Sequence, residues 1–376
     1  MTGKEALFAM FSTIRHYRFL SFPFFSMPRP GRPSAVTPVT PQCATRVALL
    51  ISLLSVCYLN FGTIRQVYLS YPDAGMEILR GTAHAPEQYR VGVMWCAYWL
   101  SAPLSLSMRY GATVIDAVSL LLAGFLLLRV LERTAVYRQS QAAMQWFGGA
   151  AFVALVQFYL MWLWTPQRAE TLPTTLLVVL TLWLWQVKRG SLRRDCGVIA
   201  GLLGVALVQS LVRVDVAFFL NAGVLPATLS PLGRRLSLRR RAVVATSLTA
   251  ALIAGGVQLY LSRVVYPHAN YGYVKLWQLR PNLVHVLRWP PFMLLLGPVA
   301  WMAVQVRRRR FAEDASGMVL LAGAAMYMGA WVVVGKIDEV RIFLPFALGL
   351  TPLTVEMAMM WAGEAVNSQQ RTVNSE

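Results

Sequence analysis

Long apolar runs separated by short basic segments organise most of the chain. From residue 46 onward, apolar runs of about 17 to 25 residues recur, which is the length that an α-helix needs to cross a bilayer. The runs are continuous rather than alternating, and this favours membrane helices over a β-barrel. The pattern therefore predicts an all-α, polytopic membrane protein of about ten transmembrane helices. The predicted spans are 46–64, 112–131, 143–164, 171–187, 196–212, 216–231, 242–262, 290–306, 317–335 and 341–361.

The two ends of the chain differ from this pattern. The stretch MPRPGRPSAVTPVTPQ holds five prolines and no apolar periodicity, so residues 1–45 are predicted to be a disordered cytoplasmic segment. Met27 stands just before this tract and offers an alternative translation start to Met1. The transmembrane domain is predicted over 46–363, and a cytoplasmic tail over 364–376.

Charge gives the predicted orientation. The net charge of +19 would suggest nucleic-acid binding in a soluble protein, but here the basic residues lie in short loops between spans. Six segments together hold 23 basic and 7 acidic residues. They are the N-terminal segment, RVLERTAVYR, KRGSLRRD, GRRLSLRRR, RRRRFAED and the C-terminus. The opposite side holds 12 basic and 7 acidic residues, and the other two acids lie within spans. We therefore expect the basic loops and both termini in the cytoplasm, and no nucleic-acid partner.

This orientation requires an odd number of crossings between residues 65 and 129. The segment VGVMWCAYWLSAPLSLS is apolar, but a crossing there, in addition to the span at 112–131, would move the basic loops to the outer side. Residues 88–107 are therefore predicted to form an interfacial or re-entrant helix on the outer face. The two tryptophans and one tyrosine of VGVMWCAYWLSAPLSLS suit the headgroup region.

The first outer loop, YPDAGMEILRGTAHAPEQYR, is rich in ionisable residues. Asp73 and Glu77 are four residues apart and would share one helix face. One of them could act as a general base, or the two could hold a divalent metal. The alternative is a solvated loop helix in which Glu77 pairs with Arg80. Arg90 could bind a ligand, or could belong to an ion pair at the start of the interfacial helix.

Three other outer segments carry candidate anion ligands. Arg213 and Asp215 interrupt an apolar stretch, where they mark the turn of a helical hairpin or bind an anion. Lys336 and Arg341 open the last span, as membrane anchors or as ligands of a lipid phosphate. The segment 263–289, which includes His268, is basic and aromatic, so it suits sugars and phosphates or lipid headgroups in general.

Three segments resemble the membrane-embedded glycosyltransferases of the GT-C superfamily, which use polyprenyl-phosphate sugars as donors. They are YPDAGMEILRG, APLSLSMRYGATVIDAVSLLLAGFLLLRVL and EVRIFLPFALGLTPL. The resemblance implies sugar transfer to an acceptor on the extracytoplasmic face of a bacterial inner membrane, with Asp73 as general base. Arg341, alone or together with Arg213, would hold the phosphate leaving group, and a divalent metal is allowed but not required.

The predicted site therefore combines acids of the first loop with cations of several outer segments. Its catalytic members are Asp73 and Glu77, and its substrate-binding members are Arg80, Arg90, Arg213, His268, Lys336 and Arg341. The expected partners are a lipid-linked sugar donor and membrane lipids. Two alternatives stay open: a transporter or lipid-handling protein without chemistry, and a polysaccharide polymerase or ligase.

Overall fold

The described part of the chain is built from helices. The computed structural model describes residues 40–70, 75–162, 170–187, 191–229, 239–269, 277–307, 315–337 and 339–373, and no strand occurs among them. The longer helices are α2 (Pro41–Ser70), α5 (Met108–Arg133), α7 (Ala142–Trp162), α8 (Thr171–Trp185), α9 (Leu192–Ala222), α11 (Arg240–Tyr260), α13 (Trp289–Arg307), α14 (Ala315–Val334) and α16 (Thr351–Val373). The shorter ones are α3 (Met76–Arg80), η1 (Glu87–Tyr89), α4 (Val91–Ser101), η2 (Ala102–Leu104), α6 (Ala135–Gln139), α10 (Val224–Leu229), the π-helix η4 (Leu261–Val265), α12 (Leu279–Val284), η5 (Val286–Arg288), η6 (Val340–Phe343) and α15 (Leu344–Gly349).

Six helices of the described chain are long and apolar enough to cross a membrane. They are Pro41–Thr63, Met108–Arg133, Ala142–Met161, Leu192–Pro226, Arg240–Val265 and Gly317–Val334. The pair Val340–Gly349 and Thr351–Glu364, bent by 59°, can supply a seventh span. The chain is thus a multi-pass helical membrane protein. The predicted count of ten is not confirmed, in part because α8 has only 15 residues, which is shorter than a typical transmembrane helix.

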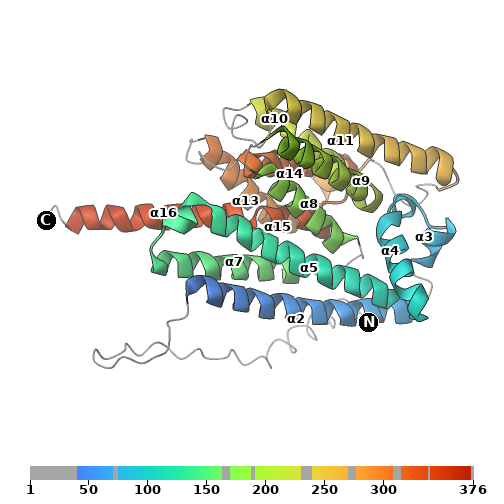
Figure 1. Cartoon of the computed structure of the whole chain (residues 1–376), viewed down its shortest axis with the longest axis horizontal. Helices are drawn as coiled ribbons and strands as arrows, with labels where there is room; N and C mark the ends of the chain where they lie inside the picture. Colours follow the sequence, from blue (N-terminus) through green and yellow to red (C-terminus); the bar gives the residue numbers. More distant parts are fainter. Residues whose placement is uncertain are drawn as a thin grey trace. The chain divides into compact units, whose positions relative to one another are not determined.

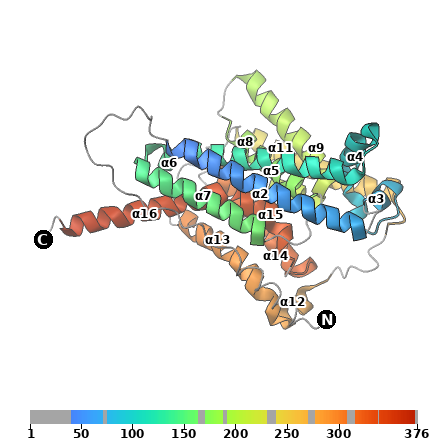
Figure 2. The same cartoon turned by 90° about the horizontal axis from the view of Figure 1, so that it is seen from below.

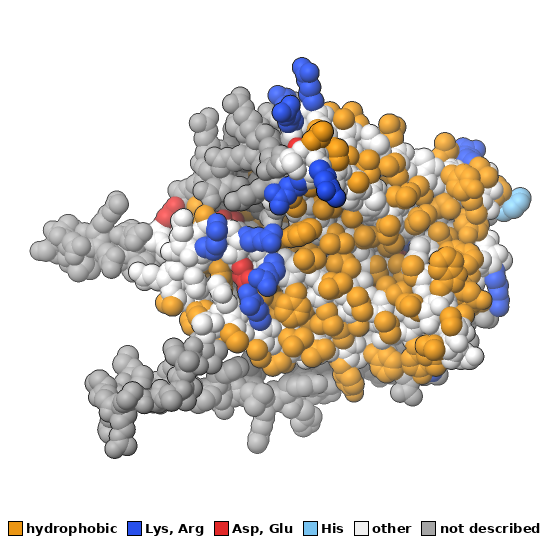
Figure 3. Space-filling view, in the orientation of Figure 1, with side chains coloured by type: hydrophobic (Ala, Val, Ile, Leu, Met, Phe, Trp, Pro, Cys, Tyr) orange, Lys and Arg blue, Asp and Glu red, His pale blue; other side chains and the backbone are white. Residues whose placement is uncertain are grey.

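The surface agrees with a membrane environment. Figure 3 shows a broad apolar face bordered on one side by a row of Lys and Arg side chains. Large apolar residues point outward from the spans, such as Ile51 in α2 and Leu252 in α11, which are 61% and 75% exposed. An apolar face of this extent would be a liability in water, whereas lipid chains cover it without cost.

Close packing joins α2 to its neighbours. In Figures 1 and 2, α2 runs beside α5 and α7. Leu53 of α2 fills the space left by Gly124 of α5, where an added Cβ would lie 2.6 Å from the Leu53 Cδ1 atom. At the basic end of this group, Arg46 binds Glu132 through Nε and Nη2 at 2.9–3.1 Å. These contacts make α2 and α5 an antiparallel pair.

The helix α9 reverses direction at Arg213. This residue has non-helical dihedral angles, with φ −153° and ψ 92°, and it separates two helical arms. Val198 in the first arm and Val224 at the start of α10 belong to one buried cluster. A straight helix would place them about 39 Å apart at 1.5 Å per residue. The chain therefore forms the helical hairpin expected from the charges at 213–215.

The segment 88–107 contains a helix that is too short to span a bilayer. Its main part, α4, has 11 residues and packs against α5. Gly111 of α5 permits this approach, since a Cβ there would collide with the backbone of Ala97. Trp95 and Trp99 of α4 are exposed. The predicted short helix is present, and its place at the outer membrane face stays a prediction.

Candidate anion-binding site

A cavity of about 490 Å³ gathers basic side chains from widely separated parts of the chain. We call it the cationic cavity. Its basic lining residues are Arg90, Arg213, His285, Arg288, Lys336 and Arg341, and its acidic ones are Glu87, Glu170 and Glu339. These residues come from η1 and the start of α4, from α8 and α9, and from the region α12 to η6. The fold therefore concentrates charge where α8, α9 and α14 meet.

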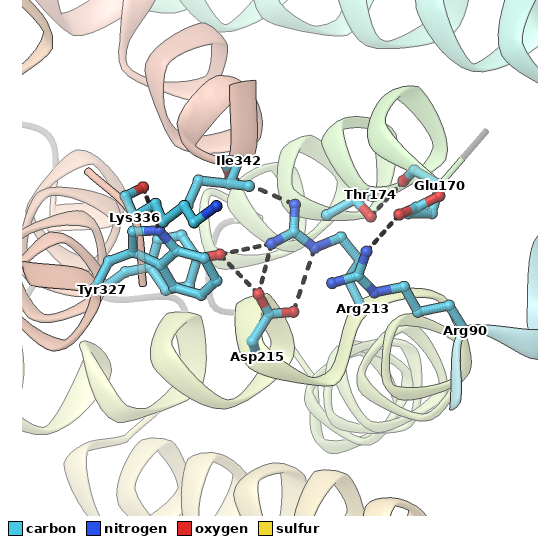
Figure 4. Close-up of polar contacts among 9 residues, drawn as sticks. Arg90, Glu170, Thr174, Arg213, Asp215, Tyr327, Lys336 and Ile342 are labelled. Carbon is cyan, nitrogen blue, oxygen red and sulfur yellow. Dashed lines mark hydrogen bonds and ion pairs between the residues drawn. The ribbon is translucent and has the colours of Figure 1, made fainter. Parts of the chain in front are cut away.

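Arg213 is the buried anchor of the cavity, with only 3% of its surface exposed. Its Nε and Nη2 atoms donate to the two carboxylate oxygens of Asp215, and its Nη1 donates to the Ile342 carbonyl at 3.4 Å. Tyr327 of α14 accepts from Nη2 and donates its hydroxyl proton to Asp215 Oδ2 at 2.6 Å. Figure 4 shows the guanidinium between this group and Glu170. The hairpin turn is thus tied to α14 and η6.

A second ion pair lies on the other side of Arg213. Arg90, which precedes α4, donates from Nη1 to Glu170 Oε1 at 2.6 Å, and both side chains are largely buried (Figure 4). Glu170 is the N-cap residue of α8, and its backbone carbonyl accepts from the Thr174 hydroxyl. The pair therefore holds the segment before α4 against the start of α8.

The opposite wall is fixed by an asparagine in α12. Asn282 is fully buried, and its Nδ2 donates to the carbonyls of Val332 and Gly335 at 2.9 and 2.7 Å. Its Oδ1 accepts from Arg288 Nη1 at 3.1 Å. Asn282 thereby attaches α12 to the end of α14 and orients Arg288 at the cavity.

Another cation of the cavity, Lys336, lies two residues after the end of α14. Lys336 is exposed, and its side chain forms no ion pair with any residue in the described ranges. Its carbonyl accepts from the Trp331 indole at 3.1 Å, which holds that ring at the cavity wall. Gly335 is required between them, because a Cβ there would overlap the indole.

The arrangement suits an anion that also carries polar groups. Arginine and lysine bind phosphate oxygens through charge-assisted hydrogen bonds. The basic side chains outnumber the three carboxylates, so the cavity favours negative charge. Trp331 offers an apolar ring face, and the carboxylates can accept from hydroxyl groups. Ionisable groups gathered within a membrane protein mark a functional site by default, since burying them is costly.

The structure brings together four of the predicted substrate-binding residues: Arg90, Arg213, Lys336 and Arg341. Glu77 and Arg80 lie on α3, which glycines at positive φ begin and end (Gly75, 86°; Gly81, 77°), and neither lines the cavity. His268 follows η4 and is likewise not among the lining residues. Asp73 lies outside the described residues, so its role as a base stays a prediction.

The predicted set omits several residues that build the site. Arg288 and His285 carry a sequence signal, because they belong to the basic and aromatic segment 263–289. Glu170 stands in a short polar loop between two apolar runs. Tyr327 and Trp331 have no comparable signal, since both lie within a continuous apolar run where aromatic residues are ordinary.

No group of three or more His, Cys, Asp and Glu side chains in the described ranges could hold a metal ion. Comparison with known proteins adds no assignment. No family model, no curated protein and no solved structure matches the chain.

Proposed function

We propose that the cationic cavity binds the phosphate of a polyprenyl-linked sugar and that the protein transfers this sugar to an acceptor on the extracytoplasmic face. The observation that carries the proposal is the convergence of Arg90, Arg288, Lys336 and Arg341 on one cavity in a multi-pass membrane protein. A lipid-linked phosphate combines the two properties this setting favours, a negative headgroup and an apolar tail.

Arg213 takes a supporting role in this proposal. All three nitrogens of its guanidinium already donate to protein oxygens. It would therefore add positive potential and hold the cavity wall, while Lys336 and Arg341 contact the phosphate. Catalysis would rest on neutralising the leaving phosphate and on positioning the acceptor.

The proposed orientation places the cavity outside. The row of basic residues would face the cytoplasm, as positive charge in short loops does in bacterial inner membranes. The two arms of α9, together with α8 and α13, would then count as separate crossings, which gives the ten spans expected from the apolar runs. The helix α4 would lie at the outer interface with Trp95 and Trp99 at headgroup level.

The test is consumption of lipid-linked sugar by purified protein in liposomes. Asp73→Asn keeps the side-chain shape and removes the basicity, so turnover should fall on the order of 100-fold or more while the protein still inserts. Glu77→Gln should have a smaller effect, unless the two acids share a metal. In that case the two variants should match, and chelators should abolish activity.

The main alternative is binding or transport of the same anion without chemistry. In that case Asp73→Asn would leave uptake or binding unchanged, and no lipid-linked sugar would be consumed by the wild type with any acceptor. This alternative would be favoured if the wild type shows no turnover and the double variant Lys336→Ala/Arg341→Ala loses binding of the lipid-linked sugar.

A further inference from the structure

A carboxyl group and an amide meet inside the bundle, at the contact between α2 and α5. Asp116 of α5 and Asn60 of α2 are 1% and 2% exposed. Asn60 Nδ2 donates to Asp116 Oδ2 at 2.9 Å. The second oxygen of each group, Asp116 Oδ1 and Asn60 Oδ1, is also buried and has no hydrogen-bond partner in the described chain. One hydrogen bond thus leaves two buried acceptors unsatisfied.

No positive charge compensates Asp116 within the described residues. The ion pairs found there involve other carboxylates. Two titratable groups interact electrostatically with Asp116. They are the Cys57 thiol, one turn before Asn60 on α2, and the Glu170 carboxylate, which directly precedes α8. Neither is cationic, and Glu170 would repel a second negative charge. An isolated carboxylate in this position would be strongly disfavoured, because it has lost its hydration without gaining a cation.

We propose that Asp116 holds a proton on Oδ1 and donates it to Asn60 Oδ1, so that the acid and the amide form a reciprocal pair. The added proton satisfies both remaining acceptors and leaves the site uncharged. Asp116 is then a proton-binding site within the membrane domain, and its ligand is a single proton.

The location gives the site a structural consequence. Two turns away along the same antiparallel contact, Leu53 packs into the space at Gly124. Release of the proton would place a negative charge between two closely packed spans and in reach of Glu170, which lines the cationic cavity. The protonation state of Asp116 therefore bears on the α2–α5 contact and on the electrostatics of the cavity. This inference does not depend on the proposed sugar transfer.

The direct measurement is infrared absorption of the full-length protein in liposomes at neutral pH, in H₂O and in D₂O. A protonated carboxyl group gives a C=O band separate from that of carboxylates, and the band shifts on deuteration. We expect such a band in the wild type and its loss in Asp116→Asn, which still allows an amide–amide pair. Glu356→Gln, which changes another buried carboxyl of a membrane helix, is the matched control and should keep the Asp116 band.

Two further variants test the pairing itself. Asn60→Leu removes the acceptor, so the band should move to higher frequency. The exchange Asn60→Asp/Asp116→Asn rebuilds the pair with the roles reversed, so it should restore the band. If Asp116→Asn alone fails to fold, this double variant is measured in its place. Three results would overturn the proposal. The first is a spectrum that Asp116→Asn leaves unchanged from the wild type, and the second is a band whose frequency Asn60→Leu does not change. The third is the absence of the band in the exchange variant.

Discussion

Arg213 has its whole guanidinium engaged within the protein, and this makes it a structural centre of the cationic cavity. Its partners Asp215 and Tyr327 come from the second arm of α9 and from α14, so one side chain fixes the relative position of two helices. Removing one member of such a buried pair leaves an uncompensated charge, which costs more than the pair itself contributes.

We therefore expect Arg213→Leu to lower the free energy of unfolding by about 3 kcal/mol, because Asp215 is left without its cation. Asp215→Leu should do the same through Arg213. The double variant should be more stable than either single one, since it leaves no unpaired charge. Unfolding in mixed detergent micelles measures all four proteins, and single-variant losses that simply add would contradict the coupling.

The same residues show how far sequence reasoning reaches at this scale. Arg213 and Asp215 are conspicuous because they interrupt an apolar stretch, and the hairpin turn follows from that interruption. Their partner Tyr327 cannot be found in the same way, since it is separated by more than a hundred residues of chain and sits among other apolar side chains. Pairing across helices depends on packing, which no local pattern contains.

At the scale of elements, the end of the second arm of α9 approaches α14 through two glycines, Gly223 directly after α9 and Gly323 within α14. A Cβ on Gly223 would lie 2.6 Å from the Gly323 Cα atom, so neither helix can carry a larger residue at this point without moving. Small residues allow backbones to approach in membrane helices, where dispersion contacts replace the hydrophobic driving force. The crossing thereby keeps Tyr327 within reach of Arg213.

Gly223→Ala should destabilise the protein by about 1–3 kcal/mol through this overpacking. Gly204 in the first arm of α9 is the matched control, because a Cβ there meets nothing within 4 Å. Gly204→Ala should be neutral or slightly stabilising, as alanine is the better helix former. Thermal unfolding in detergent separates the two outcomes, and equal melting temperatures for both variants would contradict the close crossing.

The sequence predicts some helix boundaries well and others poorly. The apolar runs locate α5, α7, α11 and α14 within a few residues, because a span must fill the bilayer with apolar side chains. The run at 341–361 does not predict the break between α15 and α16, which the structure bends by 59°. That break lies at Leu350, two residues before Pro352, whose missing amide hydrogen limits continuous helix formation.

For the whole molecule, the membrane arrangement and the cationic cavity form one argument. Two groups of basic residues lie at different ends of the spans. Arg46 and Arg129 lie at the start of α2 and the end of α5, whereas Lys336 of the cationic cavity follows the end of α14. A cavity for a lipid-linked donor is useful only on the side where the acceptor is found. Orientation is therefore a direct requirement of the proposed function.

Reporter fusions test this orientation. Fusions after Arg189 or Arg241 should report the cytoplasm, since basic loops are retained there, and a fusion within 264–285 should report the outer side. The reverse pattern would place the cationic cavity in the cytoplasm and remove the basis for extracytoplasmic sugar transfer.

The most direct measurement is the affinity of the purified protein for polyprenyl phosphate in nanodiscs, followed by quenching of tryptophan fluorescence. Lys336→Ala/Arg341→Ala should weaken binding by about 100-fold or more, because each lost charge-assisted hydrogen bond contributes about 1.5–3 kcal/mol. Arg109→Ala, which removes a cation at the start of α5 outside the cavity lining, should bind like the wild type. Uncharged polyprenol should bind weakly to all three proteins. Two results would contradict an anion site in the cationic cavity. One is that the double variant and Arg109→Ala bind polyprenyl phosphate with equal affinity, and the other is that the wild type binds polyprenol as tightly as its phosphate.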